Sequence, residues 1–146
     1  LYNLARFECN VELRIVLNKV NYRRLPKISQ FIFKNLPFVK YISFMGLEFT
    51  GWSIRNADSI WIDPVEYKNE LQQAVDELTS WGMTVSIFNI PLCLLDSPFH
   101  QYSCKSISDW KMMFTECCNT CLMKNDCCGL FSTSKHQSRG ISPFHI

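Results

Sequence analysis

Three short apolar runs, separated by two helical patterns, constrain the fold of this chain more than any other feature of its sequence. Residues 11–17, 38–45 and 83–88 are rich in β-branched and other apolar residues, which predicts a strand in each run. Between them, residues 21–35 and 63–82 carry apolar side chains at helical spacing. Strands that alternate with helices are joined by right-handed crossovers, so the sequence predicts an α/β fold with a parallel sheet.

The second helix carries the clearest boundary signals. Asp63 is a favourable N-cap, Pro64 suits the first helical position, and Glu66 stands three residues after the cap, as in a capping box. Gly82 can end the helix in the left-handed conformation. Three strands make a small sheet with an exposed edge, and residues 1–8 have the pattern of a helix that enters from upstream. We therefore expect the second part of a larger α/β barrel or sheet, followed by a Cys-rich segment of loops and short helices.

Five of the eight cysteines lie between Cys117 and Cys128, and this cluster is the sharpest chemical signal. The spacing Cys118-x2-Cys121-x5-Cys127, with the distant Cys93, suits an iron–sulfur cluster, which often takes three close cysteines and one remote one. Structural zinc also takes four thiolates, but usually from two CxxC pairs, and only one CxxC is present. A disulfide framework is the third alternative. Spacing alone does not separate iron–sulfur from zinc, and the adjacent pairs leave Cys117 and Cys128 as competing ligands.

Polar residues follow each predicted strand, where parallel α/β folds bind their ligands. Asn18 follows the first strand, Glu48 the second and Asn89 the third. Within the first strand, Glu12 and Arg14 share the face opposite the apolar one, because side chains alternate. Such charges need a partner or a ligand, which predicts either an internal Glu–Arg pair or a binding role.

Charge is unevenly distributed along the chain. Residues 1–40 hold eight basic and two acidic side chains, whereas residues 41–100 hold two basic and eight acidic ones. The overall net charge is only +2, and no alternation of basic and aromatic residues resembles an RNA-binding motif, so we expect no nucleic-acid partner. No apolar run reaches the about 18 residues of a membrane span, so we expect no membrane partner either.

Several stretches resemble radical-SAM peptide-modifying enzymes. Residues 11–19 are similar to a late barrel strand of that family, and the spacing Cys118-x2-Cys121-x5-Cys127 resembles its carboxyl-terminal SPASM or twitch auxiliary-cluster segment. More narrowly, six short stretches resemble, in the same order, the C-type radical-SAM maturase of His-Xaa-Ser peptide systems: residues 35–39, 45–48, 61–64, 92–96, 106–111 and 138–141.

The resemblance implies a partial (β/α) barrel that binds S-adenosylmethionine and a [4Fe-4S] cluster. Reductive cleavage of S-adenosylmethionine would then generate a radical that abstracts hydrogen from a residue of a ribosomally made precursor peptide. The matching positions assign four cysteines to an auxiliary [4Fe-4S] cluster: Cys93, Cys118, Cys121 and Cys127. Strand ends and strand facing suggest four residues for the S-adenosylmethionine pocket: Arg14, Asn18, Glu48 and Asn89.

One departure from the family bears on function, because no CxxxCxxC motif for the catalytic cluster occurs in this sequence. The resemblance therefore implies a carboxyl-terminal part, inactive alone, with residues 1–90 as the distal half of a radical-SAM barrel and 91–146 as the auxiliary-cluster segment. Expected partners are the precursor peptide and either a partner maturase or the missing amino-terminal half, in the cytoplasm. The alternative is a zinc-stabilised α/β binding module without redox chemistry.

Overall fold

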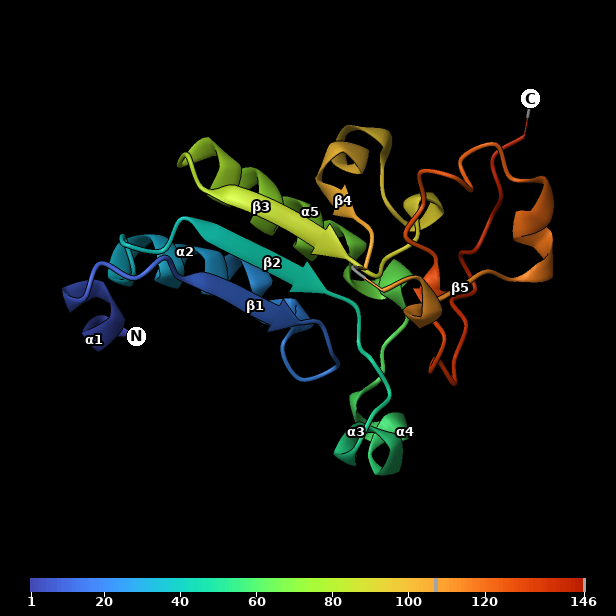
Figure 1. Cartoon of the computed structure of the whole chain (residues 1–146), viewed down its shortest axis with the longest axis horizontal. Coiled ribbons are helices and arrows are strands. Elements are labelled where there is room, and N and C mark those ends of the chain that lie inside the picture. Colours follow the sequence, from blue (N-terminus) through green and yellow to red (C-terminus); the bar gives the residue numbers. More distant parts are fainter. Residues whose placement is uncertain (107, 146) are drawn as a thin grey trace.

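A parallel sheet of order β1-β2-β3-β4 forms the centre of the protein, and β5 and β6 make a separate antiparallel pair (Figure 1). The structure is a computed structural model that describes residues 1–106 and 108–145; Ile107 and Ile146 lie outside the described residues. The strands are β1 (Glu12–Val16), β2 (Tyr41–Met45), β3 (Thr84–Phe88), β4 (Ser103–Cys104), β5 (Met112–Met113) and β6 (Leu130–Phe131). The α-helices are α1 (Tyr2–Arg6), α2 (Leu25–Asn35), α3 (Trp52–Arg55), α4 (Ala57–Ile60) and α5 (Pro64–Ser80). Short 3-10 helices are η1 (Tyr22–Arg24), η2 (Leu92–Leu94), η3 (Ser97–Tyr102), η4 (Asp109–Lys111) and η5 (Glu116–Thr120).

The predicted alternation of strands and helices is confirmed. The fold is α/β, and all pairs in the four-stranded sheet are parallel. The sequence missed β4, because a two-residue strand has no periodicity to read. It also missed α3 and α4, which are single turns within the long connection 46–62. Strand β4 comes after residue 90 and still belongs to the same sheet. The expected division of the chain into two domains at that residue stays a prediction.

Helix α5 begins as the sequence predicted. The Asp63 carboxylate accepts a hydrogen bond from the Val65 N–H at 3.2 Å, and Pro64 occupies the first helical position. Gly82 has a φ of 77°, the left-handed conformation expected after the helix. Glu66 does not complete a capping box through its side chain, which pairs instead with Arg139.

The sheet buries one face and exposes the other. Helices α2 and α5 pack together behind the sheet, where the largest fully buried side chains include Phe44, Ile42 and Leu71 (Figure 1). On the uncovered face, Arg14 donates to Glu12 at 3.1 Å. The predicted Glu–Arg pair therefore forms, but both side chains are exposed and the pair is not internal. Hydrogen bonds from Arg14 and Ser43 hold the pKa of the Glu12 carboxyl below its usual value. None of the helices in the described residues is long and apolar enough to cross a membrane.

Replacing Gly46 by Ala should lower the free energy of unfolding by about 3 kcal/mol, because overpacking against rigid backbone costs that order of energy. The added Cβ would lie 2.5 Å from the Asn89 carbonyl oxygen, and the hydrogen bond from the Gly46 N–H to the Phe88 carbonyl holds the two segments together. Gly82→Ala is the control, since its Cβ meets open space and costs only left-handed strain, about 1 kcal/mol. Urea denaturation compares the two variants, and equal costs would contradict the close approach.

Candidate metal centre

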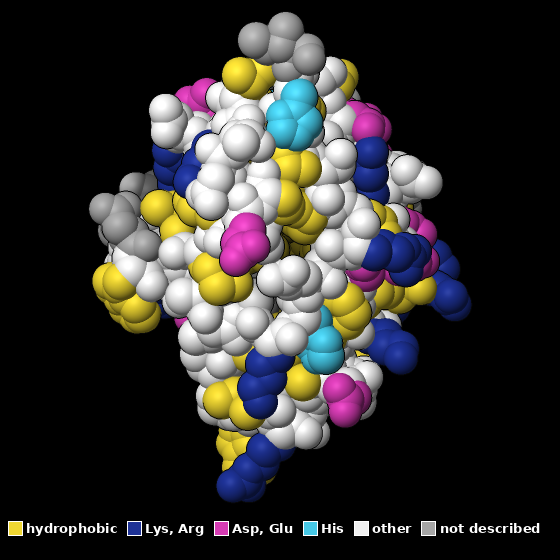
Figure 2. All heavy atoms as spheres, turned by 90° about the vertical axis from the view of Figure 1, so that its right-hand side faces the viewer, with side chains coloured by type: hydrophobic (Ala, Val, Ile, Leu, Met, Phe, Trp, Pro, Cys, Tyr) yellow, Lys and Arg dark blue, Asp and Glu magenta, His cyan; other side chains and the backbone are white. Residues whose placement is uncertain are grey.

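A pocket is lined by four cysteines, and the segments that line it lie beyond the carboxyl ends of the sheet strands (Figure 1). Figure 2 looks onto this side of the molecule, and hydrophobic side chains gather along a hollow in its middle. The pocket walls are otherwise mostly apolar, with Phe114, Leu130 and Phe144 among them, and its free space is about 20 Å³. That space has room for one or two water molecules.

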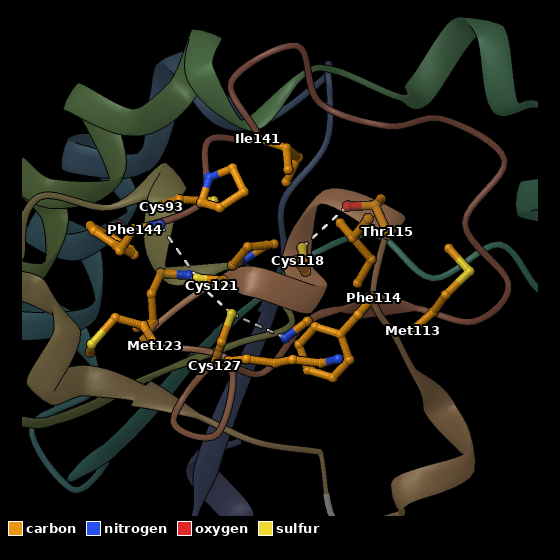
Figure 3. A pocket seen from close by; sticks show the side chains of 16 residues that line it. Cys93, Met113, Phe114, Thr115, Cys118, Cys121, Met123, Cys127, Ile141 and Phe144 are labelled. Atoms are coloured by element: carbon orange, nitrogen blue, oxygen red, sulfur yellow. Dashed lines mark hydrogen bonds between the residues drawn. The ribbon is translucent and has the colours of Figure 1, made fainter. Parts of the chain in front are cut away.

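The four thiols come from three separate parts of the chain (Figure 3). Cys93 lies in η2, shortly after β3. Cys118 lies in η5, Cys121 ends that helix, and Cys127 lies in the loop that leads to β6. All four line the same pocket, so the structure brings together the four cysteines that the sequence selected. No group of three or more potential ligands in the described residues is gathered closely enough to hold a metal ion.

Three of the four sulfurs take part in hydrogen bonds. The N–H groups of Leu92 and Gly129 both donate to Cys127 Sγ at 3.4 Å, and the Phe144 N–H donates to Cys121 Sγ at 3.4 Å. The Thr115 hydroxyl hydrogen-bonds with Cys118 Sγ at 3.2 Å. Hydrogen bonds to sulfur stabilise thiolates and tune the potential of a metal cluster that they hold.

The surroundings lower the pKa of one thiol and raise that of another. A hydrogen bond from the Cys128 thiol lowers the pKa of Cys127 to about 6, against the effect of burial, with further help from backbone N–H donors and the charge of Lys105. Burial raises the pKa of Cys93, and the neighbouring sulfurs of Cys127 and Cys118 add to that rise. A bound cation would favour the thiolate form of every one of these groups.

The other four cysteines lie outside the pocket lining, and all eight thiols are free. Cys128 is fully buried, and its Sγ lies 3.0 Å from the Ile90 carbonyl oxygen. Cys117 is exposed, although its Sγ shares the Thr115 hydroxyl with Cys118. Cys9 is exposed in the segment before β1, and Cys104 lies in β4. The geometry thus separates each adjacent pair into one pocket-lining thiol and one thiol that does not line the pocket.

The four residues suggested for an S-adenosylmethionine pocket do not meet in one pocket in this structure. Arg14 lies on the uncovered face of the sheet, paired with Glu12. Asn18 caps the turn after β1, where its amide oxygen accepts from the Val20 N–H at 2.9 Å. Glu48 forms an ion pair with Lys111 at 3.5 Å, which ties the connection after β2 to η4.

Asn89 is the fourth of these residues and lines a different pocket, together with Tyr67 and His136. Its φ of 59° is left-handed, it is 6% exposed, and its side-chain nitrogen has no hydrogen-bond partner among the described residues. A buried donor without a partner costs free energy, and strained or unsatisfied groups of this kind are typical of functional sites. The assignment of the four residues to a cofactor stays a prediction.

Sequence reasoning did not identify the groups that surround the sulfurs. The donors to Cys127 and Cys121 are backbone N–H groups, which every residue but proline carries, so no pattern marks them. Thr115 could have been noticed from its place two residues before the first adjacent pair. No protein-family model, curated protein or solved structure matches the chain. Function is therefore inferred from the pocket itself and from the short motifs in the sequence.

Proposed function

We propose that this chain is the carboxyl-terminal part of a radical S-adenosylmethionine enzyme that modifies a ribosomally made precursor peptide. In this proposal Cys93, Cys118, Cys121 and Cys127 hold an auxiliary [4Fe-4S] cluster. The observation that carries it is the shared pocket, because four thiols chosen from sequence spacing line one cavity at the carboxyl end of a parallel sheet. That edge is where parallel α/β folds place their ligands.

The donor set suits the cluster. Four cysteine thiolates are the ligand set of [4Fe-4S] clusters, and such a cluster, when bound, supplies one-electron chemistry. The chain contributes an apolar wall that excludes water, together with N–H donors aimed at two of the sulfurs. A bound cluster would need more room than this pocket offers, so the loops around Cys118 and Cys127 would have to move apart to hold it.

The remaining parts of the proposal follow from the resemblance to peptide maturases. The parallel sheet leaves one face uncovered by helices, and that face carries the polar side chains of Glu12, Arg14 and Ser43. A missing barrel half, supplied by a longer chain or by a partner maturase, would cover this face and complete a site for S-adenosylmethionine. Arg14, Asn18, Glu48 and Asn89 are the residues that would contribute to it from this side.

The second candidate is a zinc-stabilised α/β binding module without redox chemistry. The small free space favours it, because a single ion needs less room than a cluster. Zinc with Zn–S bonds of about 2.3 Å would draw its four sulfurs to about 3.8 Å from one another. The loops around Cys118 and Cys127 would then move toward each other, whereas binding of a cluster would move them apart.

Metal analysis of the whole chain tests both candidates. The protein is purified without oxygen, then supplied with ferrous iron and sulfide in one sample and with zinc in another. We expect a brown protein with about four irons and matching sulfide per chain, and a low-temperature paramagnetic resonance signal after reduction. A colourless protein that retains about one zinc and no iron would refute the cluster and support the binding module. Retention of neither metal would refute both.

A further inference from the structure

The segment Ser138–Phe144, which we term the strap, forms one wall of the cysteine pocket. Three of its residues line the pocket: Ile141, Pro143 and Phe144. The Phe144 N–H donates to Cys121 Sγ at 3.4 Å, and Cys93 lines the same pocket. Near its far end, the Phe144 carbonyl accepts from the Leu122 N–H at 3.0 Å. The strap thus places a backbone donor on one predicted ligand, Cys121, and forms a wall beside another, Cys93.

Asp63 fastens the other end of the strap. The Ser138 hydroxyl donates to one oxygen of the Asp63 carboxylate, and the Arg139 N–H donates to the other oxygen at 3.0 Å. Asp63 is 5% exposed, and the same carboxylate also caps α5 through the Val65 N–H. One buried side chain therefore joins the start of the central helix to the wall of the pocket.

Close packing holds the strap in the same place. Gly140 follows the two residues that Asp63 binds, and a Cβ there would lie 2.4 Å from Val65 Cγ1 and 2.9 Å from Leu94 Cδ2. Only a residue without a side chain lets the strap lie this close to α5 and η2. The Arg139 guanidinium adds an exposed pair with Glu66 on the surface of α5.

We propose that Asp63 is a positioning residue for the cysteine pocket, which holds the strap so that the Phe144 N–H reaches the sulfur of Cys121 and the strap covers Cys121 and Cys93. The inference rests on the proposed function, since it treats these cysteines as metal ligands. When Asp63 no longer holds the strap, Cys121 loses this donor, and Cys121 and Cys93 both lose their shield from solvent. Fewer hydrogen bonds to sulfur destabilise the reduced, more negative form of a cluster, so its reduction potential becomes more negative.

Two variants displace the strap by unrelated means. Asp63→Asn keeps a good N-cap for α5, but its amide nitrogen cannot accept the strap's second hydrogen bond. Gly140→Ala forces the strap away from Val65 and Leu94 and leaves the carboxylate intact. Glu66→Gln is the matched control, because it weakens only the exposed pair with Arg139. Each variant is first shown to unfold cooperatively, and either of the first two suffices if the other does not fold.

Thiol alkylation of the metal-free chain gives the main readout. Iodoacetamide modification is followed at each cysteine by peptide mass spectrometry, with the exposed Cys9 as the internal standard. We expect Cys121 and Cys93 to react about tenfold faster in both strap variants, because a strap that opens more often uncovers their sulfurs to the reagent. Glu66→Gln should leave these rates unchanged. The reconstituted variants should also show a more negative reduction potential than the parent chain.

Unchanged alkylation rates in both strap variants would overturn the inference and leave the cluster proposal standing, because metal content judges that proposal separately. An unchanged potential in a loaded strap variant would likewise overturn the role of the backbone donor. Failure of the parent chain to bind iron would refute the proposed function, and with it the assignment of Asp63 to a metal centre. Faster alkylation at Cys117 alone would also count against the inference, since Cys117 does not line the pocket.

Discussion

Cys118→Ala should reduce the iron content of the reconstituted chain from about four ions to nearly none, because a [4Fe-4S] cluster needs its cysteine ligands. Cys117→Ala should leave the iron content unchanged. The two thiols are adjacent in sequence and both lie near the Thr115 hydroxyl, but only Cys118 lines the pocket. The pair is therefore a matched comparison in which the chemical change is the same and only the direction of the side chain differs.

Iron, sulfide and visible absorption of both variants are measured beside the parent chain, with Cys9→Ala as a further control. Cys9 is exposed and lies before the sheet, so its loss should change none of these quantities. If Cys117→Ala lost the iron and Cys118→Ala kept it, the adjacent thiol would be the ligand and the pocket geometry would be wrong in this detail. If both variants kept the iron, the cysteine cluster would not be the metal site.

Asp63→Ala should lower the free energy of unfolding by roughly 4 kcal/mol, the sum of a lost helix cap and two lost hydrogen bonds to a buried carboxylate. Alanine cannot accept from the Val65 N–H, and it leaves the Ser138 hydroxyl and the Arg139 N–H without their partner. Domains of this size are typically stable by only about 5–15 kcal/mol, so the loss is a large share of the total. Asp76→Ala, at an exposed position of α5, is the control and should cost little.

The same carboxylate makes the effect depend on pH. Burial favours a raised pKa for Asp63, but hydrogen bonds from Ser138 and from the Arg139 and Val65 N–H groups outweigh it, and the net shift is downward from 3.8. A lowered folded-state pKa contributes stability above the unfolded-state value, and this contribution is lost as the pH falls through the folded-state pKa. Denaturant titrations should therefore show the parent and Asp63→Ala converging in acid. A difference that stayed constant down to the lowest pH would mean that the charge of Asp63 contributes nothing.

The fold was largely predictable because its signals are local. Alternation and helical spacing indicated β1, β2, β3 and α5, and the cap at Asp63 needed only neighbouring residues. The elements that were missed, β4 and the turns α3 and α4, are too short to carry a period. The helix expected over residues 21–35 was predicted too long, because its first turn is the 3-10 helix η1 and α2 begins only at Leu25.

The candidate site was predictable only as a set of cysteines. Spacing selected Cys118, Cys121 and Cys127, and the place of Cys93 directly after a strand suggested the fourth. The second role of Asp63 was not predictable, because its partners Ser138 and Arg139 lie far away in sequence. The polar residues at the strand ends share an edge of the sheet, but Asn18 bonds within its own turn and Glu48 pairs with Lys111. The Asn89 side-chain nitrogen has no partner among the described residues. Topology placed them together, whereas only side-chain geometry could show that they do not converge.

The contact between Asp63 and Ser138 joins residues 75 positions apart, and this separation orders the events of folding. The entropy lost on closing so long a loop is recovered only after the intervening chain has folded, so non-local contacts of this kind form late. Helix α5 and the central strands can form first, from nearby contacts, and the strap then docks on a finished surface. Seven of the eight cysteines lie between the two residues that this contact joins. We therefore expect that in a newly made chain the sheet can form while the thiols are still open to metal, oxidant or chaperone.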